Sequence, residues 1–186
     1  MPSKYQELPS TIFTLTQREY KDTRLRDADG RVMYWIETTN KVTRVFRPSP
    51  NSPKECIAEL EFHMFDTSTV SYAGTKQPVK DMFPRKKLAT GRKAQTPMGE
   101  GVWNTGKQTP FLRIDKRLIA KYESNKHTFQ QSSPATLSVA NEALYFLDLI
   151  IVGWVMVMRD LEMGEKGEAI GGAADAVGSV LEALGS

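Results

Sequence analysis

A glutamate and a histidine stand two residues apart in an alternating segment, and this spacing could support acid–base chemistry. Residues 57–64 alternate apolar and polar side chains, so Glu61 and His63 share one face of an expected strand. A histidine oriented by a carboxylate can act as a general base. The alternative is a histidine on the solvent face of a sheet. Tyr34, within another alternating segment, is a further catalytic candidate.

Motifs of known enzyme classes do not accompany these residues. The sequence contains no phosphate-binding glycine loop, dinucleotide-binding fingerprint, metalloprotease helix or nucleophile elbow. One cysteine, Cys56, and two histidines far apart in sequence cannot form a cysteine/histidine zinc site. We therefore expect no metal and no cofactor. Cys56 would be a nucleophile only if the fold placed a histidine beside it.

A cluster of positive charge between residues 76 and 93 is the second candidate site. Asp81 is the only acid within it, and the residues that we expect to bind a ligand are Lys80, Arg85, Lys86, Lys87, Arg92 and Lys93. Such a cluster can contact the phosphates of a lipid headgroup or of a nucleic acid. Nucleic acid fits less well, because no aromatic side chains alternate with the charges. The alternative is a solvated basic loop.

Three apolar residues near this cluster have two interpretations each. Met82 and Phe83 could insert into a membrane surface beside the basic residues, or they could face the core. Trp103 lies between glycines and could line a ligand cleft, or it could fill the core as bulky aromatic residues usually do. We retain Trp103 among the candidate ligand-binding residues.

Short segments with a period near two must position these side chains. They cover residues 12–16, 23–26, 31–38, 41–47, 57–64, 69–72, 80–83, 101–104, 111–114 and 118–122. Gly30 ends a hairpin turn where a positive φ is required, and three prolines within residues 48–53 predict a loop. Strands this short, with turns about every ten residues, predict a sandwich or a barrel.

A nearly uninterrupted apolar run, Leu144–Met158, follows the strands. It predicts a core helix over residues 139–159, with Ser138 or Asn141 as its cap. With Ala143 the run has sixteen residues, which would span about 24 Å as a helix; this is short for a membrane span, and Asp148 disfavours one further. A buried pair of strands and a membrane-inserted segment are the alternatives.

The predicted domain occupies residues 11–162 of the 186-residue chain, between a polar N-terminal tail of residues 1–10 and a Gly/Ala-rich tail of residues 163–186. The second tail has apolar residues at helical spacing, so it predicts a helix that docks or oligomerises, or a disordered segment. The formal net charge of +3 indicates no particular partner. A single cysteine and the lack of a signal peptide lead us to expect a cytoplasmic protein, at a membrane periphery if it binds lipid.

The order of features, many short strands and then one apolar helix, resembles the tubby C-terminal-like superfamily, which includes phospholipid scramblases and LURP-one-related proteins. More narrowly, the chain resembles a domain of unknown function found in mushroom-forming fungi. The residues that carry this second resemblance are Thr43–Arg47, Ile57–His63, Val102-Trp103 followed by Leu112, Ile119–Tyr122 and the apolar run from Leu147.

The resemblance implies a mainly β fold, a closed antiparallel barrel around one apolar C-terminal helix. It also implies phosphoinositide binding through a basic pair, for which Lys86 and Lys87 are the choice from charge alone. We therefore expect a non-enzymatic binding module that recognises a lipid headgroup or a protein partner. The alternatives are an enzyme with a pocket in the β scaffold, acting on a small or lipophilic substrate, and an oligomerising structural protein.

Overall fold

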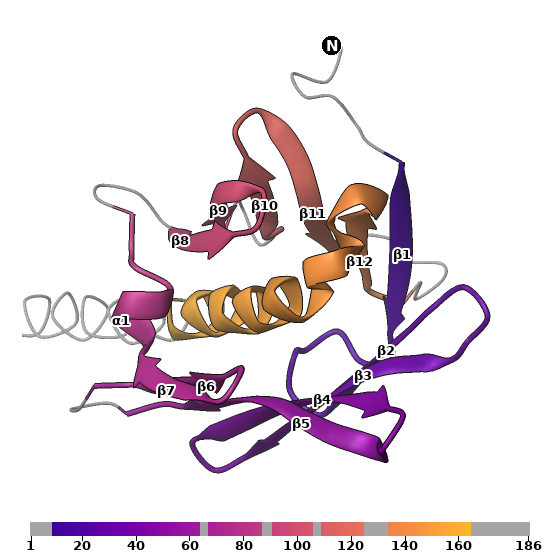
Figure 1. Ribbon diagram of the computed structural model, residues 1–186, viewed down its shortest axis with the longest axis horizontal. Helices are drawn as coiled ribbons and strands as arrows, with labels where there is room; N and C mark the ends of the chain where they lie inside the picture. The colour runs from indigo at the N-terminus through magenta and orange to yellow at the C-terminus, as the bar shows by residue number, and fades with distance from the viewer. Residues whose placement is uncertain (1–8, 64–66, 87–90, 106–108, 125–133, 165–186) are drawn as a thin grey trace, which may run out of the picture.

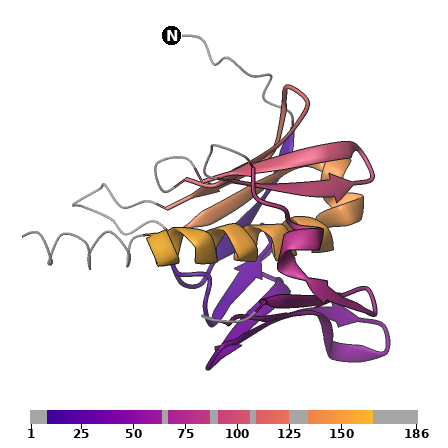
Figure 2. The same cartoon turned by 90° about the vertical axis from the view of Figure 1, so that its left-hand side faces the viewer.

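One antiparallel β-sheet wrapped around a buried helix makes up the part of the chain that the structure describes. The computed structural model describes residues 9–63, 67–86, 91–105, 109–124 and 134–164. Within these ranges twelve strands form the sheet, and residues 147–164 form the helix. Figures 1 and 2 both show the helix running through the middle, with one half of the sheet on each side. We call residues 147–164 the central helix.

The strands lie side by side largely in chain order. Their bounds are β1 (Ser10–Leu15), β2 (Thr23–Arg26), β3 (Val32–Thr39), β4 (Val42–Ser49), β5 (Ser52–Glu61), β6 (Thr69–Tyr72), β7 (Thr75–Pro78), β8 (Gly91–Thr96), β9 (Gly99–Asn104), β10 (Phe111–Ile114), β11 (Arg117–Glu123) and β12 (Thr136–Ala140). The order across the sheet is β7-β6-β5-β4-β3-β2-β1-β12-β11-β10-β9-β8. The sheet thus consists of two runs of sequential antiparallel strands, β1–β7 and β8–β12. They meet where β1, the first strand, pairs with β12, the last.

Alternation along the strands decides which side chains face the central helix. In β3, Tyr34 and Ile36 are buried, whereas Trp35 between them is partly exposed on the outer face. Because successive side chains of a strand point to opposite faces, one face of the sheet supplies the core and the other contacts solvent. The expected turn at Gly30 is confirmed, with φ of 79°.

The central helix confirms the prediction that the apolar run is a core helix. Ile151, Val152, Trp154 and Val157 are fully buried, and the apolar face extends around the helix. The helix begins later than the predicted residue 139. Residues 136–140 pair with β1 and β11 as β12, and a 3₁₀ helix, η1 (Asn141–Phe146), follows without a side-chain cap. Among the described residues, no helix has both the length and the apolar character required to cross a membrane.

The predicted closed barrel is wrong, because the sheet has two free ends. In the described part of the chain, β7 and β8 are its edge strands and do not pair with each other. β7 has four residues, ends at Pro78 and leads directly into a short helix, α1 (Val79–Met82). The edge of β8 is covered instead by the segment after α1: Lys93 N donates to Pro84 O at 2.9 Å, and Lys86 N donates to Gly91 O at 3.1 Å. A non-strand segment thus occupies the position that a barrel would give to β7.

Other predicted elements differ from the structure for local reasons. Residues 80–83 are not a strand, because α1 turns the chain away from the sheet edge. The proline-rich segment is not a loop throughout: β4 extends over Pro48 and β5 begins before Pro53. Pro48 lies in a register irregularity between Arg47 and Ser49, where a strand tolerates the missing donor. Strands β7, β8 and β12 were not predicted, since their sequences are largely polar or lack clear alternation. The predicted tail of residues 163–186 lies almost wholly outside the described residues.

The central helix approaches the sheet most closely at Gly153. A Cβ atom placed on Gly153 would lie 2.4 Å from Nε1 of Trp103, the β9 tryptophan, which is 1% exposed. Real Cβ atoms do not come this close to an indole ring, so the indole occupies the space that any other residue would need. Glycine within a helix costs up to about 1 kcal/mol relative to alanine, which this contact offsets.

We predict that Gly153→Ala destabilises the fold by about 1–2 kcal/mol, because the methyl group must displace the Trp103 indole. The free energy of unfolding from urea titration followed by tryptophan fluorescence measures the loss. Gly164→Ala is the matched control, since a Cβ at Gly164 contacts nothing within 4 Å, and it should leave stability equal or slightly higher. Equal stability of Gly153→Ala and the unmodified chain would contradict the packing described here.

Candidate functional site

A pocket opens at the N-terminal end of the central helix, where the helix meets β3 and β4. Its volume is about 370 Å³. Its aromatic lining comes from Tyr34, Tyr72, Tyr145 and Phe146, and its charged lining groups are Arg47 and Asp148. We call this the rim pocket. A pocket of this size, lined by aromatic rings and by a few converging polar groups, is typical of small-molecule sites.

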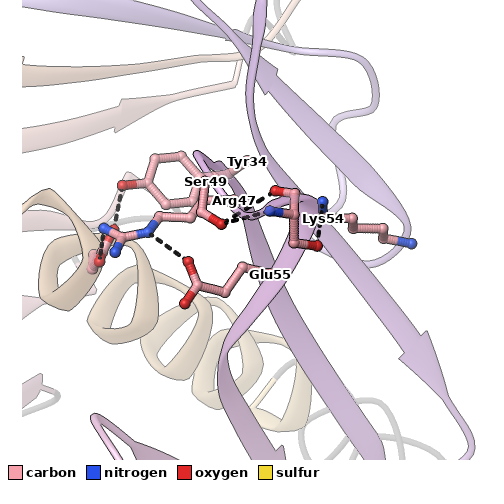
Figure 3. Close-up of polar contacts among 7 residues, drawn as sticks. Tyr34, Arg47, Ser49, Lys54 and Glu55 are labelled. Carbon is pink, nitrogen blue, oxygen red and sulfur yellow. Dashed lines mark hydrogen bonds and ion pairs between the residues drawn. The ribbon is translucent and has the colours of Figure 1, made fainter.

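Asp148 is the centre of the polar contacts in the rim pocket. The Tyr34 hydroxyl donates to Oδ1 of Asp148 at 2.6 Å, and Nη1 of Arg47 donates to Oδ2 (Figure 3). Nε of Arg47 also lies 3.8 Å from a carboxylate oxygen of Glu55. Both Asp148 oxygens therefore have a partner, which offsets the desolvation of a side chain that is only 19% exposed. Its negative charge near the helix N-terminus is also favourable.

The tyrosines of the rim pocket are held in their neutral form. Burial, followed by the hydrogen bond to Asp148, raises the pKa of Tyr34 far above its ordinary value of 10.0. Burial and the negative charge of Asp148 also raise the pKa of Tyr72. Neither phenol is activated as a base near neutral pH. Both side chains are suited to hydrogen bonding rather than to proton abstraction.

Tyr145 is the exposed member of the aromatic lining. Its side chain is 67% exposed, and its ring meets that of Phe146 edge to face at 5.0 Å between centroids. The ring contributes little to the core, since most of its surface remains in water. An exposed aromatic face at the mouth of a pocket is available to a ligand.

The other end of the central helix carries a second polar centre, Asp160. Nε and Nη2 of Arg92 donate to its two oxygens at 2.6 and 2.9 Å, and Nη1 of Arg92 donates to the carbonyl oxygen of Phe83 at 2.9 Å. Arg92 is 6% exposed. This predicted ligand-binding residue is therefore occupied in joining β8 to the helix, and its donors are not directed at solvent.

The remaining basic residues divide into paired and unpaired ones. Lys93 lies 2.9 Å from Glu100. Lys80 and Lys86 are exposed and form no ion pair within the described part of the chain. Arg85, whose side chain is 77% exposed, lies 3.7 Å from an Asp160 oxygen that Arg92 already contacts. We call Lys80, Arg85 and Lys86 the basic surface; Lys87 lies outside the described residues.

The predicted acid–base pair is formed but is a surface feature. Nε2 of His63 lies 3.5 Å from Oε1 of Glu61, while Nζ of Lys76 lies 3.1 Å from the other Glu61 oxygen. The hydrogen bond and charge of Lys76 hold the pKa of Glu61 below its ordinary value. Tyr34, the third catalytic candidate, is part of the rim pocket. The structure therefore does not bring the three together.

Two other residues with predicted chemical roles, Trp103 and Cys56, are not placed to perform them. Trp103 fills the core against Gly153, so its side chain does not reach a ligand surface. Partial desolvation and the charge of Glu59 raise the pKa of the Cys56 thiol, which disfavours its nucleophilic form. Cys56 lies within β5, whereas His63, seven residues later, follows the end of that strand, so the sequence does not place the two side by side. Within the described ranges, no cluster of His, Cys, Asp and Glu could hold a metal ion.

The sequence alone did not identify Arg47, Tyr72, Tyr145 or Asp148 as site residues. One signal was available for Asp148, because a lone charge within an apolar run must find a buried partner. Its partners come from β3 and β4, more than a hundred residues earlier, and nothing in their local sequence marks them. Tyr145 could not be distinguished from the core aromatics of the same run.

Comparisons with known proteins identify a family but no activity. The model of a family of unknown function, DUF6593, matches residues 18–163, so the chain belongs to that family. Among solved structures, the chain is similar to a protein from Arabidopsis thaliana at 8% sequence identity and a TM-score of 0.42, covering 86% of this chain and 95% of that one. No curated protein matches the sequence.

We predict a coupling free energy of about 1 kcal/mol between Tyr34 and Asp148, because substitution of either residue removes the hydrogen-bond partner of the other. A double-mutant cycle of Tyr34→Phe and Asp148→Ala, followed by urea unfolding, measures this coupling. A second cycle with Tyr72→Phe in place of Tyr34→Phe is the control, and it should give a smaller coupling. Additive effects of Tyr34→Phe and Asp148→Ala would show that the contact does not stabilise the fold.

Alkaline pH should unfold the chain through its buried tyrosines. Burial, with further local contributions, raises the pKa values of Tyr20, Tyr34, Tyr72 and Tyr122, that of Tyr122 to about 12. A raised pKa in the folded state contributes stability that is complete below the ordinary value of 10.0 and is lost as pH rises through the folded value.

Phenolate absorbance and circular dichroism, recorded together against pH, measure this effect. We expect ionisation of the buried tyrosines to coincide with loss of structure, and the unfolding free energy of Tyr34→Phe to depend less steeply on pH above 10. Complete ionisation of all tyrosines with unchanged circular dichroism would refute the prediction.

Proposed function

We propose that this member of the DUF6593 family is a non-enzymatic binding module that docks on anionic lipid headgroups through the basic surface. The observation that carries the proposal is that Lys80, Arg85 and Lys86, which lie within seven residues of sequence, are exposed. The two lysines are free of ion pairs among the described residues. Unpaired surface cations are attracted to anionic membranes.

The electrostatics of Asp160 supports the availability of Arg85. Arg92 already donates to both oxygens of Asp160, and its buried position makes this the dominant pair. The contact of Arg85 with the same carboxylate is longer and exposed, and such pairs contribute little. Arg85 can therefore exchange Asp160 for a phosphate at small cost.

Binding of this kind would depend on charge alone. Phe83 is fully buried, and Met82 packs against the core, so neither supplies an apolar group for insertion into the lipid. Each cation near an anionic membrane contributes about 1 kcal/mol, and salt screens the attraction. Such an association would be reversible and would place the chain, as we propose, in the cytoplasm at the membrane periphery.

Two further proposals follow from the sequence. Kinship with the tubby C-terminal-like superfamily is supported by the arrangement of an antiparallel sheet around one apolar helix, apart from the barrel closure. A protein partner is the alternative ligand of the basic surface. The enzyme alternative has less support, since side chains of the central helix fill the interior where its pocket was expected. Oligomerisation through the C-terminal tail concerns residues outside the described ranges.

We predict that the full chain co-sediments with phosphatidylcholine vesicles containing phosphatidylserine or phosphatidylinositol bisphosphate at low salt, and much less with pure phosphatidylcholine. Lys80→Glu combined with Lys86→Glu should abolish binding, because it replaces two attractive charges with two repulsive ones.

The matched control is Lys41→Glu combined with Lys116→Glu, two exposed lysines in turns of the sheet, which changes the net charge equally. This variant should retain most of the binding. Equal, negligible sedimentation of the unmodified chain with all vesicles would rule out lipid binding. Equal loss in both double variants would show that net charge, and not the basic surface, is responsible.

A further inference from the structure

The rim pocket combines strong hydrogen-bonding groups with no net charge. Its charged lining groups, Arg47 and Asp148, form an ion pair with each other. An anion would have to compete with Asp148 for Arg47, and a cation would have to compete with Arg47 for Asp148. From this balance we infer that the rim pocket binds a neutral sugar residue.

The ion pair leaves hydrogen-bonding capacity for hydroxyl groups. A guanidinium carries five donors and a carboxylate accepts about four hydrogen bonds, and only part of each is used between Arg47 and Asp148. The Tyr34 hydroxyl donates to Asp148, which leaves its own oxygen free to accept. Adjacent hydroxyls of a sugar both donate and accept, so they can bind to such a fixed set of donors and acceptors without disturbing it.

The aromatic lining matches the other surface of a sugar ring. Tyr145 is 67% exposed, and its ring and that of Phe146 meet at 77°. The C–H groups on the face of a sugar carry slight positive charge, which suits the negative face of an aromatic ring. A wholly apolar ligand would fit less well, because it would desolvate Arg47 and Asp148 without replacing their contacts with water.

The size and position of the pocket agree with one sugar ring. A volume of about 370 Å³ holds a single ring and several waters. The pocket lies at the N-terminal end of the central helix, whereas the basic surface lies near Asp160 towards the other end. Sugar binding is therefore independent of the proposed lipid binding, and either can fail without the other.

Saturation-transfer NMR on the full chain tests the inference, with D-glucose, D-galactose, D-mannose and myo-inositol as separate neutral probes. Tetramethylammonium and acetate are the charged probes. We expect transfer to at least one neutral probe at millimolar concentration and none to the charged ones. Tyr145→Ala should weaken the binding about five-fold, since it removes one stacking face and little of the core.

Ile12→Ala is the matched control, because Ile12 is another exposed large apolar side chain and does not line the pocket. This variant should bind the sugar as the unmodified chain does. Three results would overturn the inference: no transfer to any neutral probe, transfer to a charged probe that depends on Tyr145, or sugar binding that Tyr145→Ala leaves unchanged.

Discussion

The central helix is apolar around its whole circumference, and this creates a constraint that the rest of the structure must meet. Burial of apolar surface is strong but has no direction, so it does not by itself fix how far the helix is inserted or how it is rotated. Polar side chains at its ends provide that direction. Asp148 binds Tyr34 and Arg47, Asp160 binds Arg92, and Glu162 accepts from the hydroxyl of Tyr20 at 3.1 Å. Asp148 and Asp160 are about 18 Å apart along the helix, so the contacts define both ends.

This arrangement also determines where chemistry can occur. The interior is filled by helix side chains, of which Trp154 and Val155 are fully buried, and a substrate has no room there. Polar groups are therefore gathered where the helix ends meet solvent. At one end, the partners of Asp148 form the wall of the rim pocket. At the other end, the pair of Arg92 with Asp160 lies beneath exposed cations.

The sequence predicted the parts of the fold that follow from local patterning. Strand β2 matches its prediction, and the apolar run is the core helix, because alternation and uniform hydrophobicity are properties of neighbouring residues. Strands such as β8 (Gly91–Thr96) were missed, since Arg92 is an inward-facing residue that looks polar until its partner Asp160 is known. The closed barrel was wrong because closure depends on what lies between the two edge strands. The rim pocket was missed for the same reason: Arg47 and Asp148 are neighbours only in the folded chain.

The open seam of the sheet connects the structural ion pair with the proposed function. Because Pro78 ends β7, the chain crosses from one edge to the other through α1 and the segment Phe83–Lys86, which binds the edge of β8 through its backbone. Arg92 joins this segment to the central helix: one of its nitrogens donates to the Phe83 carbonyl oxygen and two donate to Asp160. A single buried arginine thus holds the segment that presents Arg85 and Lys86. Arg92 is buried and structural, whereas Arg85 and Lys86, a few residues earlier, are exposed to a ligand. The number of basic residues in a segment therefore does not give the positive charge that is available to a ligand.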